Sequence, residues 1–204
     1  MQIERTPIEG VLVLTPARFG DNRGFFSESW NRRTLEGAGV SLPEFVQDNH
    51  SVSARAGTLR GLHYQAPPHA QGKLVRCGRG ALLDVAVDAR RGSATYGQHV
   101  IVELSAENGK QLWVPAGMLH GFVTLMDDTE IVYKCTDHYD RGRCCRSPPA
   151  EDSRRESSRL GWGHEQAFSR PLPHDELVQR QRRPATARLA AGLVRPGDGL
   201  AGAT

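Results

Sequence analysis

Ten short runs of strand-forming residues follow one another between residues 11 and 136, and they constrain the fold more than any other feature of the sequence. The runs are 11–15, 24–30, 45–53, 58–64, 73–78, 81–88, 98–105, 110–115, 119–125 and 129–136. Each is short and is bounded by turn-forming residues. Many short strands at a spacing of roughly 8–12 residues are typical of a β-sandwich or β-barrel. We therefore predict an all-β jelly roll.

A clear strand pattern and the near-absence of helical segments both support an all-β fold. The run at 81–88, ALLDVAVD, alternates between Leu83, Val85 and Val87 on one face and Asp84, Ala86 and Asp88 on the other. A period of two residues is the signature of a strand. Within residues 1–140, only NRRTLEGAG, at 31–39, is predicted to be helical, and it is brief.

The strand pattern stops at about residue 140. Residues 141–204 contain twelve Arg, no Lys and seven acidic residues, and they are also rich in Ser, Pro and Gly. Such a composition buries little apolar surface. We predict a domain at 1–140 followed by an atypical, Arg-rich and poorly ordered tail at 141–204.

Composition excludes several classes of function. No apolar run approaches the roughly 18 residues that a membrane span needs, and the first ten residues lack the apolar core of a signal peptide, so we expect a cytoplasmic protein. The net charge of +3 belongs to the tail, because residues 1–140 hold 14 basic and 16 acidic residues. We therefore expect no nucleic-acid partner. The four cysteines form no CxxC pair and are expected to be reduced.

The stretch TLRGLHYQ, at 58–65, places an arginine and a histidine in a strand without an acidic residue. Buried strands seldom tolerate this combination. Alternation separates Arg60 from His63, but a bulge or kink at Gly61 would bring them to one cavity. The alternative is a histidine satisfied at the edge of a sheet.

Three further residues are candidates for the same cavity. His120 follows a Pro-Gly turn at the start of a strand, Lys73 begins the run at 73–78, and Tyr133 shares a strand face with Ile131 and Cys135. Taken alone, His120 is equally compatible with a surface histidine. A solvated lysine is the favoured interpretation of Lys73 by itself, and a core tyrosine that of Tyr133. The histidines also raise the alternative of a barrel metal site. However, the HYQ sequence offers Tyr and Gln where further metal ligands would be useful.

Several motifs occur together in a fixed order. They are DNRGFFSESW (21–30), FVQDNHSVS (45–53), LRGLHYQ (59–65), QGKLVRCGRGALLDVAVDARRGSATYG (71–97), LWVPAGMLHGF (112–122) and VYKCTDHYD (132–140). Over about 120 residues they closely resemble the dTDP-4-dehydrorhamnose 3,5-epimerase family. The resemblance implies a cupin-like jelly-roll β-barrel with few short helices and, here, an irregular C-terminal tail.

The resemblance implies inversion of C3 and C5 in dTDP-4-dehydro-6-deoxy-D-glucose, without a cofactor or metal. It assigns His63 as the base and Tyr133 as the acid, with Lys73 stabilising the enolate. It also implies a set of substrate-binding residues, which are Arg23, Glu28, Gln47, Asn49, Arg60, His120 and Tyr139. Tyr139 would stack on thymine, and the arginines suit a diphosphate. The family further implies a homodimer with strands contributed across the interface.

The sequence departs from the family in its tail. Cys144 stands where the family has a glutamate, and the aspartate that orients the catalytic histidine has no convincing counterpart around Trp162. A frameshift beginning at residues 141–144 would explain both departures. Asp84 is then a possible local carboxylate neighbour of His63. The alternatives are an epimerase acting at C3 or C5 alone, a sugar ketoisomerase, and a catalytically impaired nucleotide-sugar binding protein.

Overall fold

The computed structural model describes residues 1–142 and 144–146. Strands dominate this part of the chain, and the short helix α1, at Arg32–Gly37, is its single α-helix. The all-β prediction is therefore confirmed, as is the brief helix expected at 31–39. Almost all of the predicted tail, with the frameshift proposed for it, lies outside the described residues.

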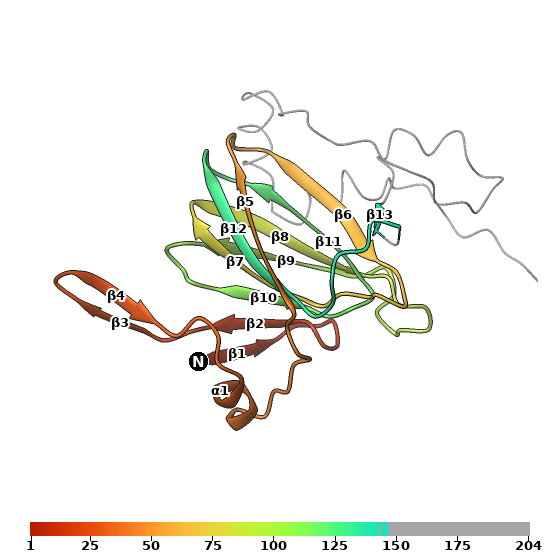
Figure 1. The fold of residues 1–204 in the computed structure, drawn as a ribbon, viewed down its shortest axis with the longest axis horizontal. Coiled ribbons are helices and arrows are strands. Elements are labelled where there is room, and N and C mark those ends of the chain that lie inside the picture. The colour runs from red at the N-terminus through yellow and green to blue at the C-terminus, as the bar shows by residue number, and fades with distance from the viewer. Residues whose placement is uncertain (143, 147–204) are drawn as a thin grey trace, which may run out of the picture.

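Two antiparallel sheets face each other without closing into a continuous barrel (Figure 1). The six-stranded sheet consists, in spatial order, of β1 (Gln2–Arg5), β2 (Leu12–Thr15), β10 (Gln111–Val114), β7 (Lys73–Arg79), β12 (Thr129–Cys135) and β5 (Gln47–Ser53). The five-stranded sheet consists of β13 (Cys144–Arg146), β6 (Leu59–Gln65), β11 (Met118–Thr124), β8 (Ala81–Asp88) and β9 (His99–Ser105). The sequence analysis missed β1, β13 and a further strand, β3 (Arg18–Asp21).

The main hydrophobic core lies between the sheets. Its fully buried members come from both layers and include Val75 and Ile131 from one sheet and Leu82 and Leu104 from the other. On β8 the inward face is the one that carries Ala86, so Asp84 and Asp88 also point into the protein and are buried. The strand face that looks polar in the sequence is thus an interior face.

A second apolar cluster covers the outer face of the six-stranded sheet. Leu74 and Trp113 project outward there, because they alternate with the inward-facing residues of β7 and β10. They pack against Leu35 of α1, whose N-terminus is capped by the side chain of Asn31. The helix therefore seals one part of this face.

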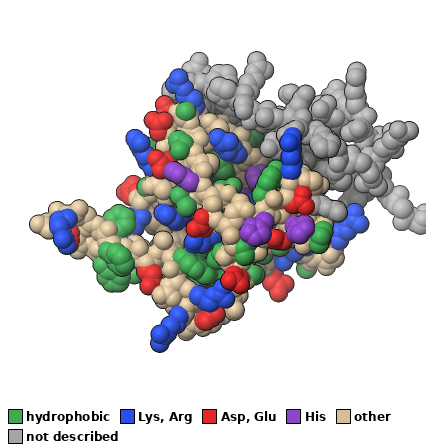
Figure 2. All heavy atoms as spheres, in the orientation of Figure 1, with side chains coloured by type: hydrophobic (Ala, Val, Ile, Leu, Met, Phe, Trp, Pro, Cys, Tyr) green, Lys and Arg blue, Asp and Glu red, His purple; other side chains and the backbone are tan. Residues whose placement is uncertain are grey.

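The third sheet is a hairpin of β3 (Arg18–Asp21) and β4 (Gly24–Ser27) that extends away from the two-layered body (Figure 1). At its base, the guanidinium of Arg18 donates to the carbonyl oxygens of Ala106 and Glu107, both at 2.6 Å. Figure 2 shows apolar side chains gathered along the hairpin, between its tip and the body. The hairpin is thus anchored at one end and projects at the other.

No helix within residues 1–142 and 144–146 is long and apolar enough to cross a bilayer.

Candidate active site

A pocket of about 240 Å³ opens between the two sheets. Strands of both sheets line it: β5, β7 and β12 on one side and β6 and β13 on the other. Its lining residues are Gln47, Asn49, His63, Tyr64, Gln65, Gln71, Lys73, Tyr133, Cys135, Tyr139 and Cys144. Six of the ten residues predicted for the site thus meet in one cavity, namely His63, Lys73, Tyr133, Gln47, Asn49 and Tyr139.

The backbone of β6 is irregular just before His63. Gly61 has a φ of +121°, and the pairing of β6 with β11 shifts in register between His120 and Phe122. This is the kink that the sequence suggested at Gly61. Beyond it, His63 lines the pocket, and its ring lies edge-on to that of His120, with the ring centroids 6.0 Å apart.

Two titratable side chains face His63 from the opposite sheet. Lys73 begins β7 and is 7% exposed, and burial lowers the pKa of its ammonium group. Tyr133 lies on the neighbouring strand β12, where burial raises the pKa of its phenol and the charge of Arg60 acts the other way. Burial therefore favours the neutral form of each group, which makes the phenol a proton donor at neutral pH.

Gln47 and Asn49 form one polar wall of the pocket. The side-chain amide of Gln47 donates to Asn49 Oδ1 at 2.9 Å, and the amide of Asn49 donates to the Sγ of Cys135 at 3.4 Å. The backbone N–H of Tyr139 donates to Gln47 Oε1 at 3.0 Å. This bond holds Tyr139, whose side chain is largely exposed, at the rim of the pocket.

Sequence reasoning missed several pocket residues. The amide of Gln65 donates to the carbonyl oxygens of His69 and His138, and its own oxygen accepts from the N–H of Asp140 at 2.8 Å. Gln65 thereby ties two loops to β6. Its place two residues after His63 was the signal for it, since alternation puts both on one face. Cys135 stands in the same relation to Tyr133.

No local signal points to Cys144. It reaches the pocket because β13 pairs with β6, with Cys144 opposite Gln65 and Arg146 opposite His63. Such a tertiary pairing leaves no trace in the spacing of residues along the chain.

Within 1–142 and 144–146, no group of three or more His, Cys, Asp or Glu side chains is placed to hold a metal ion.

The arrangement of the pocket and sheets has counterparts among known proteins. The model of the family described as dTDP-4-dehydrorhamnose 3,5-epimerase matches residues 5–148. The chain belongs to this family. The dTDP-4-dehydrorhamnose 3,5-epimerase of Shigella flexneri is 54% identical over 141 residues, which cover 69% of this chain and 77% of that protein. The fold is thus the cupin-like jelly roll expected from the resemblance, with open sheets.

Two solved structures of relatives contain ligands. The dTDP-4-dehydrorhamnose 3,5-epimerase of Bacillus anthracis, with TDP and PPi bound, is 46% identical with a TM-score of 0.69, covering 71% of this chain and 82% of that one. The dTDP-6-deoxy-D-glucose-3,5-epimerase of Legionella pneumophila, in complex with dTDP-4-keto-L-rhamnose, is 44% identical with a TM-score of 0.67. It is matched over 71% of this chain and 76% of its own.

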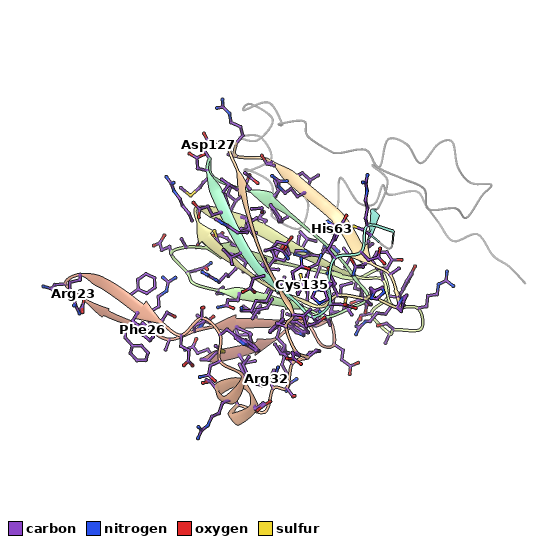
Figure 3. All side chains as sticks on the ribbon, in the orientation of Figure 1. Arg23, Phe26, Arg32, His63, Asp127 and Cys135 are labelled. Carbon is purple, nitrogen blue, oxygen red and sulfur yellow. The ribbon has the colours of Figure 1, made fainter. Side chains whose placement is uncertain are left out.

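Four of the residues that the epimerase resemblance assigned to the substrate lie outside the pocket lining. Arg23 is at the tip of the hairpin, where it pairs with Asp21 and lies far from His63 (Figure 3). Glu28 accepts hydrogen bonds from Asn31 and Thr34 just before α1, and these bonds lower its pKa. A single epimerase chain thus does not bring these two side chains to its own pocket.

The other two lie beside the pocket. Arg60 donates to the Ser53 hydroxyl and the Val52 carbonyl oxygen, which turns its guanidinium toward β5. His120 is 5% exposed and lies behind His63, with its Nε2 2.7 Å from Asp84 Oδ1. In this epimerase, His120 contacts a residue of the pocket rather than lining the pocket itself.

Proposed function

We propose that the chain inverts C3 and C5 of dTDP-4-dehydro-6-deoxy-D-glucose to give dTDP-4-dehydro-L-rhamnose. The observation that carries this proposal is that His63 and Tyr133 come from opposite sheets and line one pocket, with Lys73 beside Tyr133. A base and an acid on opposite sides of a sugar ring are what inversion requires, because the proton must leave one face and return to the other.

The chemistry follows from the C4 ketone. His63 takes the proton from C5 or C3, and the electron pair of the broken C–H bond forms a carbon–carbon double bond while the ketone oxygen becomes an enolate. The side-chain nitrogen of Lys73 stabilises that oxygen by donating a hydrogen bond to it. Tyr133 then donates its proton to the opposite face of the carbon. Each inversion leaves a protonated His63 and a deprotonated Tyr133, so solvent must reset both before the next one.

The nucleotide is proposed to lie toward Tyr139, whose exposed ring is available for stacking on thymine. Gln47 and Asn49 offer amide groups on the adjoining wall. Arg60, His120, Arg23 and Glu28 remain proposed substrate contacts. For Arg23 and Glu28 the contact requires a second subunit.

The hairpin supports a homodimer. Phe19, Phe25 and Phe26 are 66%, 59% and 70% exposed on its two strands, and Arg18 stacks over the Phe25 ring at 4.4 Å. An isolated two-stranded hairpin is marginally stable in water, and grouped exposed aromatic residues indicate an interface. We propose that the hairpin packs on a second copy and carries Arg23 to that copy's pocket.

Light scattering tests the dimer. Phe26→Ser is expected to yield monomers with weakened dTDP binding, whereas Met126→Ser, at an exposed residue of the turn between β11 and β12, is expected to leave the dimer intact. Wild-type protein that is monomeric and binds dTDP fully would refute the proposed hairpin exchange.

The proposed division of the chain stays at residue 140, with the segment 141–204 as a frameshifted tail. The family match ends at residue 148, which leaves residues 149–204 outside it. Translation of the encoding DNA in the other two frames tests it, since a family-like tail is expected in one of them. We also propose that the protein is located in the cytoplasm, on the grounds of its composition.

The activity is tested by incubating the chain with dTDP-4-dehydro-6-deoxy-D-glucose in deuterated water. Deuterium at both C3 and C5 of an L-rhamno product is expected, and His63→Asn is expected to abolish it while dTDP still binds. Deuterium at one carbon would indicate a single-position epimerase. Binding of dTDP without exchange at either carbon would indicate a binding protein and refute the proposed reaction.

A further inference from the structure

A buried aspartate and a buried histidine form a pair directly behind the pocket. Asp84 of β8 is 0% exposed and His120 of β11 is 5% exposed, and Asp84 Oδ1 lies 2.7 Å from His120 Nε2. Within the described part of the chain, the other polar atom of each side chain, Asp84 Oδ2 and His120 Nδ1, is buried without a hydrogen-bond partner. An unsatisfied buried polar atom costs roughly 1–3 kcal/mol.

This pair contrasts with another buried aspartate on the same face of β8. Asp88, four residues along, accepts hydrogen bonds from the guanidinium of Arg90 and from the hydroxyls of Ser93 and Thr95. Asp88 thus has a structural role in holding the loop after β8. Among the residues that the structure describes, Asp84 has His120 as its one side-chain partner, and an aliphatic side chain at its place would avoid the cost of burying a charge. Stability alone does not account for Asp84.

The pair connects to the pocket in two ways. His120 lies opposite His63 in the pairing of β11 with β6, and the two imidazole rings meet edge to face at 69°. On the other sheet, burial lowers the pKa of Lys73, and the negative charge of Asp84 is among those that oppose this shift. The carboxylate thus acts on residues of the pocket without lining it.

We propose that Asp84 is a positioning residue for the epimerisation, holding His120 in one tautomer against the ring of His63 and placing a fixed negative charge near Lys73. This inference rests on the proposed function. A carboxylate can only accept a hydrogen bond, so the His120 nitrogen that faces it must carry the proton. The imidazole face presented to His63 is then fixed in orientation as well.

The substitution Asp84→Asn tests the carboxylate with little change in volume. An asparagine amide can donate as well as accept, so it no longer requires a proton on His120 Nε2. Nitrogen-15 NMR of labelled histidine is expected to show a changed tautomer for His120. Deuterium exchange at C3 and C5 is expected to slow by about tenfold or more, with the affinity for dTDP changed by less than about threefold.

Asp88→Asn is the matched control, because it also neutralises a buried aspartate of β8. It is expected to lower the melting temperature while the folded enzyme exchanges deuterium at the wild-type rate. If Asp84→Asn exchanges at the wild-type rate, or leaves the tautomer of His120 unchanged, the proposal is overturned. A loss of dTDP binding in proportion to lost stability would likewise show a merely structural role.

Two further experiments distinguish a variant that does not fold from a proposal that is wrong. If Asp84→Asn does not fold, His120→Gln breaks the same contact from the other side and is expected to slow exchange to a similar extent, while normal exchange in that variant overturns the proposal. If the wild-type chain exchanges neither carbon, the proposed reaction fails. The NMR comparison then decides by itself whether Asp84 sets the tautomer of His120.

Discussion

Gly61 and Gly121 lie against each other where β6 pairs with β11. A Cβ atom built on Gly61 would lie 2.5 Å from the Cα of Gly121 and 2.8 Å from the carbonyl oxygen of His120. The two strands therefore approach more closely than side chains allow. His63 lies two residues after Gly61, and His120 immediately precedes Gly121. The distance between the two imidazole rings therefore depends on the close approach of these two glycines.

Gly61→Ala is expected to force β6 away from β11, both because of this contact and because Gly61 has a positive φ. The free energy of unfolding should fall by roughly 2–4 kcal/mol, as measured by urea denaturation. Gly37→Ala, in α1 where a Cβ meets nothing within 4 Å, is the control and should raise stability by about 0.5–1 kcal/mol. Equal stability of the two variants would contradict this account.

Tyr133→Phe removes the proposed acid and leaves the ring in place. Formation of the L-rhamno product is expected to slow by about 10²- to 10⁴-fold, while dTDP binding stays near the wild-type value. Because burial raises the pKa of Tyr133, the phenol should remain a donor at pH values up to at least its ordinary value of 10.0. Product formation by Tyr133→Phe at the wild-type rate would exclude Tyr133 as the acid.

Lys73→Met is expected to stabilise the fold while it abolishes exchange at C3 and C5. Burial lowers the pKa of Lys73, so the folded chain binds fewer protons than the unfolded chain between that pKa and 10.5. The cost of burying the charge is therefore larger at pH 7 than at pH 10.5, and at pH 7 Lys73→Met should be more stable by on the order of 1 kcal/mol. Urea denaturation from pH 7 to 10.5 should show the gap between variant and wild type narrowing. A gap that widens would contradict the sign of this shift.

Cys144 should be the thiol of the pocket that reacts with iodoacetamide. It is partly exposed and lines the pocket, whereas Cys77 and Cys135 are buried and burial raises the pKa of both thiols. Peptide mass spectrometry is expected to find Cys144 labelled first and protected by dTDP. Labelling at the same rate with and without dTDP would place the nucleotide elsewhere.

The sequence predicted most of the strands because alternation and turn residues are local. It placed Tyr133 and Cys135 on one face correctly, and it located the kink at Gly61. It could not tell which face of β8 is inward, since Asp84 looks solvent-facing until its partner His120, on β11, is known. The partners of Asp88 are close in sequence, but they lie in the loop after β8 and leave no signal in the alternation of the strand.

The same limit applies to the candidate site. The family motifs named the residues that meet in the pocket, but strand alternation could not reveal that Arg23 projects on a hairpin instead. Nor could it reveal that Cys144 lies beside Gln65, because β13 is joined to β6 across nearly 80 residues of intervening chain.

The position of β13 at the edge of its sheet has a mechanical consequence. Its last pair joins Arg146 to His63, so a force applied to the chain at Arg146 would load β6, the strand of His63, directly. Detachment of β13 would leave β6 with open backbone groups that attract strands from other molecules. A pull on the chain at Arg146 should therefore disturb the pocket, and promote aggregation, at forces too low to unfold the sheets.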